Sequence, residues 1–356
     1  MNRPPTLRDV AEKANVHTST VSRALNERTQ DMINPITVKR VRAAADALGY
    51  QPNSLARGLK TRRTLTVGML IPDLTNPLFP PIVRGIEDRF RASDYTLLLA
   101  NTDQDTSRER QIIGVMQARH VDGIIVATAR REHPVLDKLQ QEGMPLVLVN
   151  RVADLPVVSS VTADDHSGVG QAIRHLISLG HRRIAHVAGS QTTTTGVDRA
   201  SAYRYWLEAA GIAYDEKLVT IADWFTEADG AMACQELLDR GVDFTAIVAA
   251  NDLVALGCYQ ILRSAGRRVP QDVSVVGYND IPFTHAFAPP LTSVRVPLYE
   301  LGQKTADLML EHIEDEAAVH TSVRLMPRLV VRESTRALTS DEVGVDEADS
   351  PAELDR

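Results

Sequence analysis

The sequence predicts an all-α headpiece (residues 1–51), a hinge helix with its linker (52–63) and a two-lobed α/β core with parallel sheets (64–337). Three observations support this fold class. Residues 6–26 have the apolar spacing of two short helices joined by a tight turn. Basic residues are concentrated in the headpiece and linker. Beyond them, short β-branched runs alternate with helical stretches, which is typical of strands joined by helical crossovers.

The first helix pair has a cap, a turn and two distinct faces. Thr6 and Asp9 form a capping-box-like start, and Asn15 supplies the turn. Val21 and Ala24 lie on the apolar side of the second helix. Its other side carries small polar or cationic groups that can meet base edges and phosphates, namely Thr18, Ser19, Ser22 and Arg23. The spacing therefore indicates a helix-turn-helix motif that places one helix in a DNA groove.

A third helix and a short hinge helix complete the N-terminal part. Asn34 and Pro35 are the cap and first turn of the third helix, which runs to about Leu48 and is stopped by Gly49. Residues 52–60 allow only one or two helical turns. So short a helix is marginal in water because nucleation costs more than a few hydrogen bonds return. We therefore expect the hinge helix to need a partner to form.

The charge of the chain is unevenly divided. The net charge of −7 opposes nucleic-acid binding when it is taken as a whole. Residues 1–63, however, carry 12 Lys or Arg against 5 Asp or Glu, a net of +7 that leaves the remainder at −14. Cationic side chains neutralise phosphates, whereas an acidic body is repelled by the duplex. We therefore expect the DNA contacts to be confined to the headpiece and the hinge.

Composition and motifs exclude several other classes of protein. No apolar run approaches the ~20 residues that cross a bilayer, and the start lacks the apolar segment of a signal peptide, so we expect a cytoplasmic protein with no membrane partner. Cys234 and Cys258 are expected to be reduced core thiols. The sequence has no phosphate-binding glycine loop, no nucleophile elbow and no histidines at ligand spacing. We therefore expect no enzyme activity, no metal site and no cofactor.

Eight β-branched runs predict the strands of two parallel sheets. They cover residues 65–71, 95–100, 123–127, 146–150, 184–188, 219–222, 246–250 and 273–277. One lobe is expected in residues 64 to about 160 together with about 291–331, and the other in about 162–290. Residues 338–356 are acidic and lack aromatic side chains, so we expect a disordered tail there.

Residues 6–62 resemble the DNA-binding headpiece of the lactose/galactose repressor family of bacterial transcriptional regulators. The family's motifs are matched at Thr6 and at residues 9–11, 14–16, 20–23, 48–53 and 56–59. The resemblance continues to about Thr335. It implies a type I periplasmic-binding-protein-like core, with a small-molecule effector in the cleft between its lobes. It also implies a regulator, expected to be a repressor, that binds a pseudo-palindromic double-stranded operator as a homodimer.

The resemblance also implies which residues contact DNA. Leu59 stands where the family pushes a leucine between base pairs from the minor groove, with an ordinary linker leucine as the alternative. His17 stands where the family usually has a capping serine, so we expect a poorer helix cap, exchanged for a phosphate contact. The expected DNA contacts are Thr6, His17, Thr18, Ser19, Thr20, Ser22, Arg23, Asn26, Asn53, Ala56, Arg57, Leu59 and Lys60.

Ligands bind beyond the carboxyl ends of parallel strands, so residues that follow the strands are the candidates for an effector pocket. Arg199 offers a fork of donors to an anion or to vicinal hydroxyls, and a structural salt bridge is the alternative. Asn251 either faces the cleft or caps the next helix. Trp224 or Phe225 stacks on a ligand ring or fills the lobe interface. By position in the family, the expected effector contacts are Phe79, Asn150, Thr193, Thr195, Arg199, Trp224, Phe225, Asn251 and Asn279.

Departures from the family pattern suggest the chemistry of the effector. Asn150 and Asn279 stand where sugar-binding relatives often have aspartate, while Arg199 remains. Replacing two carboxylates by amides removes two negative charges, so we expect a pocket that takes a sugar acid, a sugar phosphate or a similar small anion as well as a sugar. A solute-binding module without DNA output is the alternative function, and the basic headpiece opposes it.

Overall fold

In the computed structural model the described residues are 5–26, 29–50, 63–154, 158–315 and 317–339. The chain divides into two compact units, Met1–Thr64 and Leu65–Arg356. The hinge helix expected in residues 52–60 lies outside the described residues. Among the helices that are described, none combines the length and the apolar composition needed to cross a membrane.

The first unit contains the three predicted helices. They are α1 (Leu7–Ala14), α2 (Thr18–Ala24) and α3 (Pro35–Leu48), with a 3-10 turn, η1 (Gln30–Met32), between the last two. Val10, Val21 and Val41 are fully buried and contribute one side chain from each helix to a common core. The side chain of Asn34 accepts the Ile36 N–H at 2.9 Å, which caps α3 as the sequence predicts. The helix-turn-helix body is thus held by apolar packing that leaves its polar face outside.

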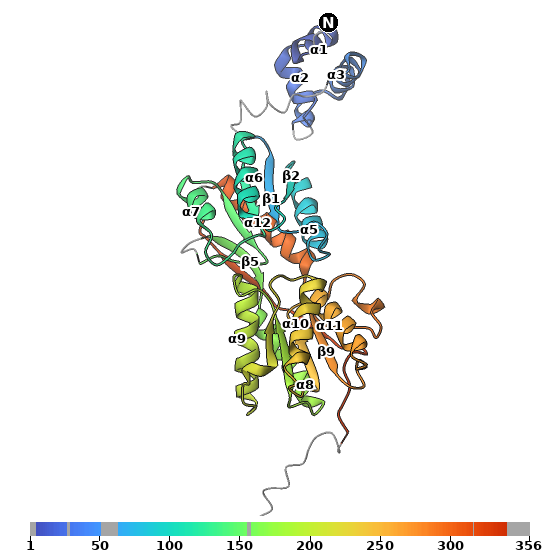
Figure 1. Cartoon of the computed structure of the whole chain (residues 1–356). Helices are drawn as coiled ribbons and strands as arrows, with labels where there is room; N and C mark the ends of the chain where they lie inside the picture. The colour runs from blue at the N-terminus through green and yellow to red at the C-terminus, as the bar shows by residue number, and fades with distance from the viewer. Residues whose placement is uncertain (1–4, 27–28, 51–62, 155–157, 316, 340–356) are drawn as a thin grey trace, which may run out of the picture. The chain divides into compact units, whose positions relative to one another are not determined.

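The second unit contains two six-stranded sheets, which form two lobes (Figure 1). The first sheet has the order β11-β5-β4-β3-β1-β2, and all of its pairs are parallel. Its strands are β1 (Thr66–Ile71), β2 (Thr96–Asn101), β3 (Gly123–Val126), β4 (Leu146–Val149), β5 (Ser159–Ala163) and β11 (Ser322–Leu325). In the second sheet, β12-β10-β9-β8-β6-β7, only the pair of β10 with β12 is antiparallel. Its strands are β6 (Ile184–Ala188), β7 (Val219–Ile221), β8 (Ala246–Ala249), β9 (Ser274–Asn279), β10 (Thr292–Arg295) and β12 (Arg328–Val330).

Helices cover both faces of each sheet. In the first lobe α5 (Phe79–Arg91) and α12 (Leu298–Glu314) share one core, whereas α6 (Thr106–Ala118) and α7 (Pro134–Gln141) belong to the other. Gly85 and Gly302 let α5 and α12 approach closely, because a Cβ at Gly85 would lie 2.2 Å from the backbone oxygen of Tyr299.

The second lobe repeats this arrangement. One face packs α8 (Asp165–Ser178) and α9 (Thr194–Ala209), and the other packs α10 (Glu227–Asp239) and α11 (Asp252–Ser264). Two 3-10 turns, η2 (Glu216–Leu218) and η3 (Thr284–Ala286), lie in its loops. Cys234 and Cys258 are free thiols buried in the core of α10 and α11, as the sequence predicts.

The chain passes between the sheets three times, and this corrects the sequence-based division of the last part. Residues 291–331 were expected wholly in the first lobe, but β10 and β12 belong to the second sheet. The cause is a polar strand, since Thr292 and Ser293 in β10 are fully buried and give no apolar signal. Residues distant in sequence satisfy their side chains, because the Thr292 hydroxyl accepts the Arg332 N–H and the Ser293 hydroxyl donates to Asp252.

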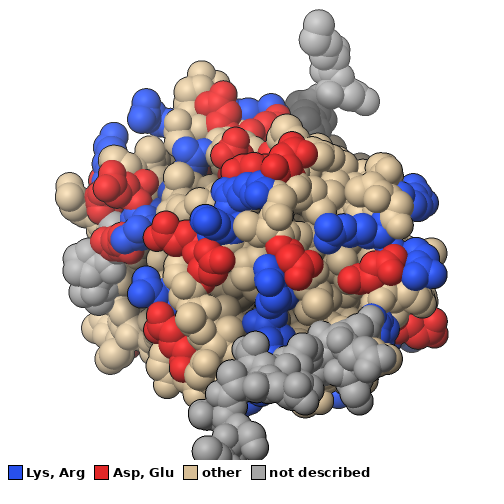
Figure 2. All heavy atoms as spheres, turned by 60° about the horizontal axis from the view of Figure 1, so that its bottom comes forward, with Lys and Arg blue, Asp and Glu red and all other residues tan. Residues whose placement is uncertain are grey.

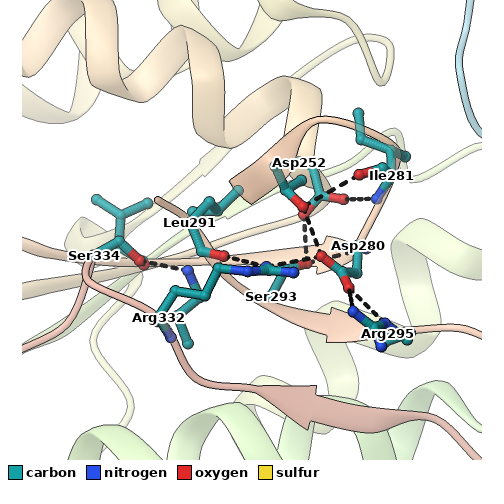
Figure 3. Close-up of polar contacts among 11 residues, drawn as sticks. Asp252, Asp280, Ile281, Leu291, Ser293, Arg295, Arg332 and Ser334 are labelled. Carbon is teal, nitrogen blue, oxygen red and sulfur yellow. Dashed lines mark hydrogen bonds and ion pairs between the residues drawn. The ribbon is translucent and has the colours of Figure 1, made fainter. Parts of the chain in front are cut away.

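A buried polar network fixes the point where β10 leaves the second sheet (Figure 3). The Asp280 carboxylate follows β9 and forms ion pairs with Arg295 at 2.5 Å and with Arg332 at 2.8 Å. Nearby, Asp252 accepts the Ser293 hydroxyl at 2.5 Å and the Ile281 N–H at 2.8 Å. The two carboxylates therefore tie together the ends of β9, β10 and β12 beside the crossovers.

The last described residues of the chain are bonded to the second lobe. The Leu338 N–H donates to the backbone oxygen of Leu179 at 2.8 Å, and the Arg336 guanidinium donates to the backbone oxygen of Gln271 at 2.6 Å. Arg336 and Leu338 are therefore anchored to the second lobe, so Leu338 does not belong to the disordered tail expected in residues 338–356. Residues 340–356 lie outside the described part of the chain.

Candidate functional site

The N-terminus of α2 is capped by an imidazole. His17 Nδ1 accepts the Ser19 N–H at 3.3 Å and lies 2.8 Å from the Ser19 hydroxyl oxygen. The distance to the N–H is at the long end for a hydrogen bond, which fits the expected poorer cap. The structure adds that His17 keeps the capping role by using a ring nitrogen as acceptor, and a nitrogen accepts only when it carries no proton. The His17 ring itself is exposed.

The polar face of α2 is open to solvent. Ser19, Ser22 and Arg23 are exposed, and Thr18 and Thr20 are partly so. Thr6 caps α1, because its hydroxyl lies 2.7 Å from the Asp9 carboxylate and the pair forms a capping box. The backbone oxygen of Asn26 accepts the N–H of Gln30. The remaining candidates lie outside the described residues: Asn53, Ala56, Arg57, Leu59 and Lys60.

The two-lobed core differs from the first unit in the distribution of charge on its surface. On its face in Figure 2, Lys and Arg side chains are interspersed with Asp and Glu. Mixed charge of this kind gives no extended stripe for phosphates among the side chains drawn there. The positive charge that DNA binding requires is therefore better supplied by the first unit, where residues 1–63 carry a net of +7.

Between the lobes, the predicted effector residues do not surround one open space. The larger hollow, of about 610 Å³, lies beside the β5–α8 crossover and is lined by Asn150 and Thr195 among others. We call it the crossover cavity. A second, small hollow is lined by Arg130 and Arg151 of the first lobe and Trp224 of the second. We call it the arginine pocket. All predicted effector residues except Asn150 and Trp224 are buried.

Arg199 is engaged by this chain's own atoms. Its Nε donates to the Asp165 carboxylate at 2.9 Å, and its Nη1 donates to the backbone oxygen of Ala250 at 2.6 Å. Its guanidinium also lies 3.8 Å from the centre of the Tyr278 ring. Both members of the ion pair are buried. The salt-bridge alternative thus describes Arg199 in this structure, and Asp165 neutralises the charge on which an anionic effector would depend.

Two further predicted residues cap helices. The side chain of Asn251 accepts the Val254 N–H at 2.8 Å and donates to the backbone oxygen of Phe225 at 3.1 Å, so it is the cap of α11. Thr193 caps α9 by accepting the Gly196 N–H at 3.3 Å. Of the two readings of Asn251, the helix cap is the one that this structure contains.

The two phenylalanines contribute to packing. Phe79 is the first residue of α5 and lies in the core of the first lobe. Phe225 belongs to the core of the second lobe, and the guanidinium of Arg151 lies 5.2 Å above its ring. Phe225 therefore fills the lobe interface, which is one of the two roles predicted for the aromatic pair. Trp224 instead borders the arginine pocket, with Arg130 5.7 Å from its ring.

Two buried groups are left unsatisfied near these residues. The side-chain oxygen of Asn279 has no hydrogen-bond partner among the described residues, and its backbone φ is +101°. Arg151 is 8% exposed, and its Nε also has no partner in the described part. Burial, together with the positive charges of Arg199 and Arg130, lowers the pKa of Arg151 to about 10. An unpaired buried acceptor or charge costs free energy that a ligand recovers by supplying the partner.

Arg151 is not among the expected effector contacts, although its position after a strand is a signal for one. Arg151 directly follows Asn150 at the carboxyl end of β4, where ligands of parallel sheets bind. Its lack of an acidic partner became evident only from the fold. Arg151 and Asn279 therefore each keep an unsatisfied buried atom, whereas Arg199, Asn251 and Thr193 are bonded within the chain.

Two family descriptions match the chain. Residues 6–53 match the bacterial regulatory proteins of the lacI family. Residues 64–333 match the periplasmic binding proteins and sugar binding domain of the LacI family. The two matches fall on the helix-turn-helix unit and on the two-lobed core, respectively.

Individual proteins agree with this result. The HTH-type transcriptional regulator CelR of Thermobifida fusca is 39% identical over 93% of this chain and 98% of the relative. A solved complex of a transcriptional regulator CelR with cellobiose has a TM-score of 0.73 at 37% identity, over 93% of this chain and 99% of that one. The lac repressor dimer bound to operator and the anti-inducer ONPF has a TM-score of 0.82 at 27% identity, over 94% and 100%. The chain therefore belongs to the LacI family of DNA-binding transcriptional regulators, which join a helix-turn-helix to a sugar-binding effector core and are not enzymes.

Proposed function

We propose that this regulator binds a pseudo-palindromic operator in the cytoplasm as a homodimer and represses transcription there. The observation that carries the proposal is the open face of α2, where Ser19, Ser22 and Arg23 are exposed above a packed three-helix core. Two such helices in a dimer read half-sites about one helical turn, ~34 Å, apart. The lac repressor structure, a dimer on its operator, supports the same arrangement for this chain.

Selection of bound fragments from a random DNA pool tests this proposal. The full-length protein is expected to enrich a sequence with two-fold symmetry and a half-site spacing near one turn of the duplex. Enrichment of a single, asymmetric half-site would contradict the homodimer. Repeating the selection with added sugars shows whether an effector weakens or strengthens operator binding.

We infer that the effector is an uncharged, hydroxyl-rich sugar bound between the lobes. The lining of the crossover cavity supports this, because Asp164 and Asp198 supply two carboxylates against one guanidinium, that of Arg324, while Asp165 is paired with Arg199. Such a lining accepts hydrogen bonds from sugar hydroxyls and repels an anion. The CelR relative was solved with cellobiose, a neutral disaccharide. This inference replaces the anionic effector that the sequence suggests, since Asp165 neutralises Arg199.

Calorimetric titration with a neutral sugar and its acid tests the charge preference. Cellobiose and cellobionic acid differ at one end only, so the pair isolates the effect of one negative charge. We expect cellobiose to bind at least tenfold more tightly. Tighter binding of the acid would overturn the inference and restore the anionic effector.

Effector binding changes DNA affinity only if the sugar binds two arrangements of the lobes with different affinities. One contact that such arrangements would change joins the lobes, since the Arg151 guanidinium of the first lies 5.2 Å from the Phe225 ring of the second. Linkage requires that operator DNA change the affinity for the sugar by the same factor as the sugar changes the affinity for DNA. Titrating the sugar with and without operator measures this factor from both sides.

A further inference from the structure

The crossover cavity is larger than a single sugar ring requires. Its volume of about 610 Å³ lies within the roughly 300–1,000 Å³ of pockets that hold drug-sized ligands. A disaccharide is of that size, whereas a monosaccharide leaves much of the space to water. The cavity also extends from the buried side chains of Thr195 and Asp165 out to an exposed rim on α9.

The rim carries aromatic rings. Tyr205 on α9 is 54% exposed and lines the cavity together with His166. The centre of the Tyr205 ring lies 4.9 Å from that of His166 and 5.4 Å from that of Trp206. We call these three residues the aromatic shelf. An exposed aromatic face takes up the weakly positive C–H groups on one side of a sugar ring.

Neighbouring residues hold the shelf in place. Trp206 Nε1 donates to the backbone oxygen of His166 at 3.0 Å, and the Arg174 guanidinium lies 4.7 Å from the centre of the Trp206 ring. Gly170 on α8 makes room for the indole, since a Cβ there would lie 2.4 Å from it. The indole is thus fixed between α8 and α9, and Tyr205 rests against it. A preorganised ring loses little entropy when a ligand stacks on it.

Hydrogen-bonding groups lie between the shelf and the buried end. Asp198 and Ser201 project from α9, and Arg324 comes from β11 on the first lobe. Acceptors and a fork of donors that face the same space match the alternating hydroxyls of a sugar. Because these groups come from both lobes, a ligand that spans them contacts both.

We propose that the crossover cavity is a site for at least two sugar rings, with one ring at the buried end near Asn150 and Thr195 and the next stacked on Tyr205. The proposal rests on the inference that the effector is a neutral sugar and specifies its length. The second ring then supplies affinity that a monosaccharide lacks, and it bridges α9 to the first lobe.

Binding measurements on two variants test the proposal. Tyr205→Ala removes the Tyr205 ring from the aromatic shelf. Tyr205→Phe keeps an aromatic ring at this position and is the matched control. Both changes are at an exposed position, and thermal melts establish that the variants fold. The probes are glucose, cellobiose, cellotriose, xylose, xylobiose and maltose, titrated calorimetrically into the full-length protein.

We expect at least one disaccharide to bind the wild type tenfold or more tightly than its monosaccharide. Tyr205→Ala is expected to lose that advantage while binding of the monosaccharide stays the same, and Tyr205→Phe is expected to retain it. Equal binding of mono- and disaccharides, or a disaccharide advantage that survives in Tyr205→Ala, overturns the second-ring site and leaves the sugar effector standing. If no neutral sugar in the series binds, the proposed effector class fails as well.

Discussion

The headpiece and the effector core use their polar residues in opposite ways. On α2, Ser22 and Arg23 are exposed on a helix held by its apolar side. In the core, Arg199 and Asn251 are buried and bonded to this chain's own atoms. A DNA-reading face can therefore be presented without rearrangement, whereas an effector that uses the buried residues must first replace bonds that already exist. The binding free energy of the ligand in the core is therefore the difference between the bonds it makes and the internal bonds it replaces. Such a difference between two states of the protein is what a ligand-controlled switch requires.

The largest loss of unfolding free energy is expected where a buried ion pair of the core is broken. Asp165→Asn removes the carboxylate from the buried pair with Arg199 and leaves an uncompensated charge, which costs about 3–5 kcal/mol of unfolding free energy. Asp243→Asn is the control, because its pair with Arg183 is exposed and contributes at most about 1 kcal/mol. Urea unfolding measures both. Equal losses in the two variants would show that Arg199 does not depend on Asp165.

The pH dependence of stability should reveal a second buried carboxyl. Burial raises the pKa of Asp252 to about 7, although its bonds from Ser293 and Ile281 oppose the shift. Since this pKa lies above the ordinary value, the stability from the protonated group is fully present at low pH and is lost as pH rises through 7. The loss is on the order of 1 kcal/mol per pH unit between about 4 and 7. Asp252→Asn is expected to lack this slope in thermal melts at pH 5 and pH 7. Parallel profiles for the two proteins would contradict the prediction.

A substitution on the exposed face of α2 should change the affinity for DNA and leave the free energy of unfolding unchanged. Arg23→Ala is expected to weaken operator binding about tenfold, at the lower end of the ~1–3 kcal/mol that a base contact contributes. Binding to random DNA should change little. Arg8→Ala serves as the control, because Arg8 is an exposed cation of α1 paired with Glu12. Fluorescence anisotropy at fixed salt measures the affinities of the wild type and of both variants for operator and for random DNA. An equal loss on operator and random DNA would reduce Arg23 to a phosphate contact.

The smallest effect is expected at Arg151, where the substitution should raise the free energy of unfolding instead of lowering it. Arg151→Met replaces a buried guanidinium that lacks a carboxylate partner by an apolar chain, so the ligand-free protein should gain about 1 kcal/mol of stability. The same change should leave sugar binding unchanged, because Arg151 lines the arginine pocket and not the crossover cavity in which the sugar is proposed to bind. Thermal melts with and without cellobiose separate the two outcomes. A variant that is less stable would contradict the prediction, and one that binds cellobiose more weakly would place Arg151 in the effector site.

Local signals in the sequence predicted the strands well where apolar residues dominate. β1, β3, β4 and β8 are short apolar runs and were found within one or two residues. β5, β10, β11 and β12 were missed because serine, threonine and arginine occupy many of their positions. The buried polar positions among them are satisfied by partners far away in the sequence, as Ser293 is by Asp252.

The candidate sites show the same division between local and distant information. Helix caps depend on neighbours in sequence, so the caps at Thr6, Asn34 and Asn251 were all within reach. The pairing of Arg199 with Asp165 joins two helices and requires the fold. Likewise, only the fold shows that Arg151 Nε has no hydrogen-bond partner among the described residues.

The threefold crossing of the chain limits how this protein can be cut and recombined. Each lobe is assembled from separate stretches, and β10 and β12 of the second sheet enclose α12 and β11 of the first in sequence. A truncation near residue 290 would therefore remove edge elements from both lobes together. The junction between Thr64 and Leu65 crosses no sheet. Exchange of effector specificity between regulators is thus expected to succeed when the whole core is moved, and to fail when a single lobe is grafted.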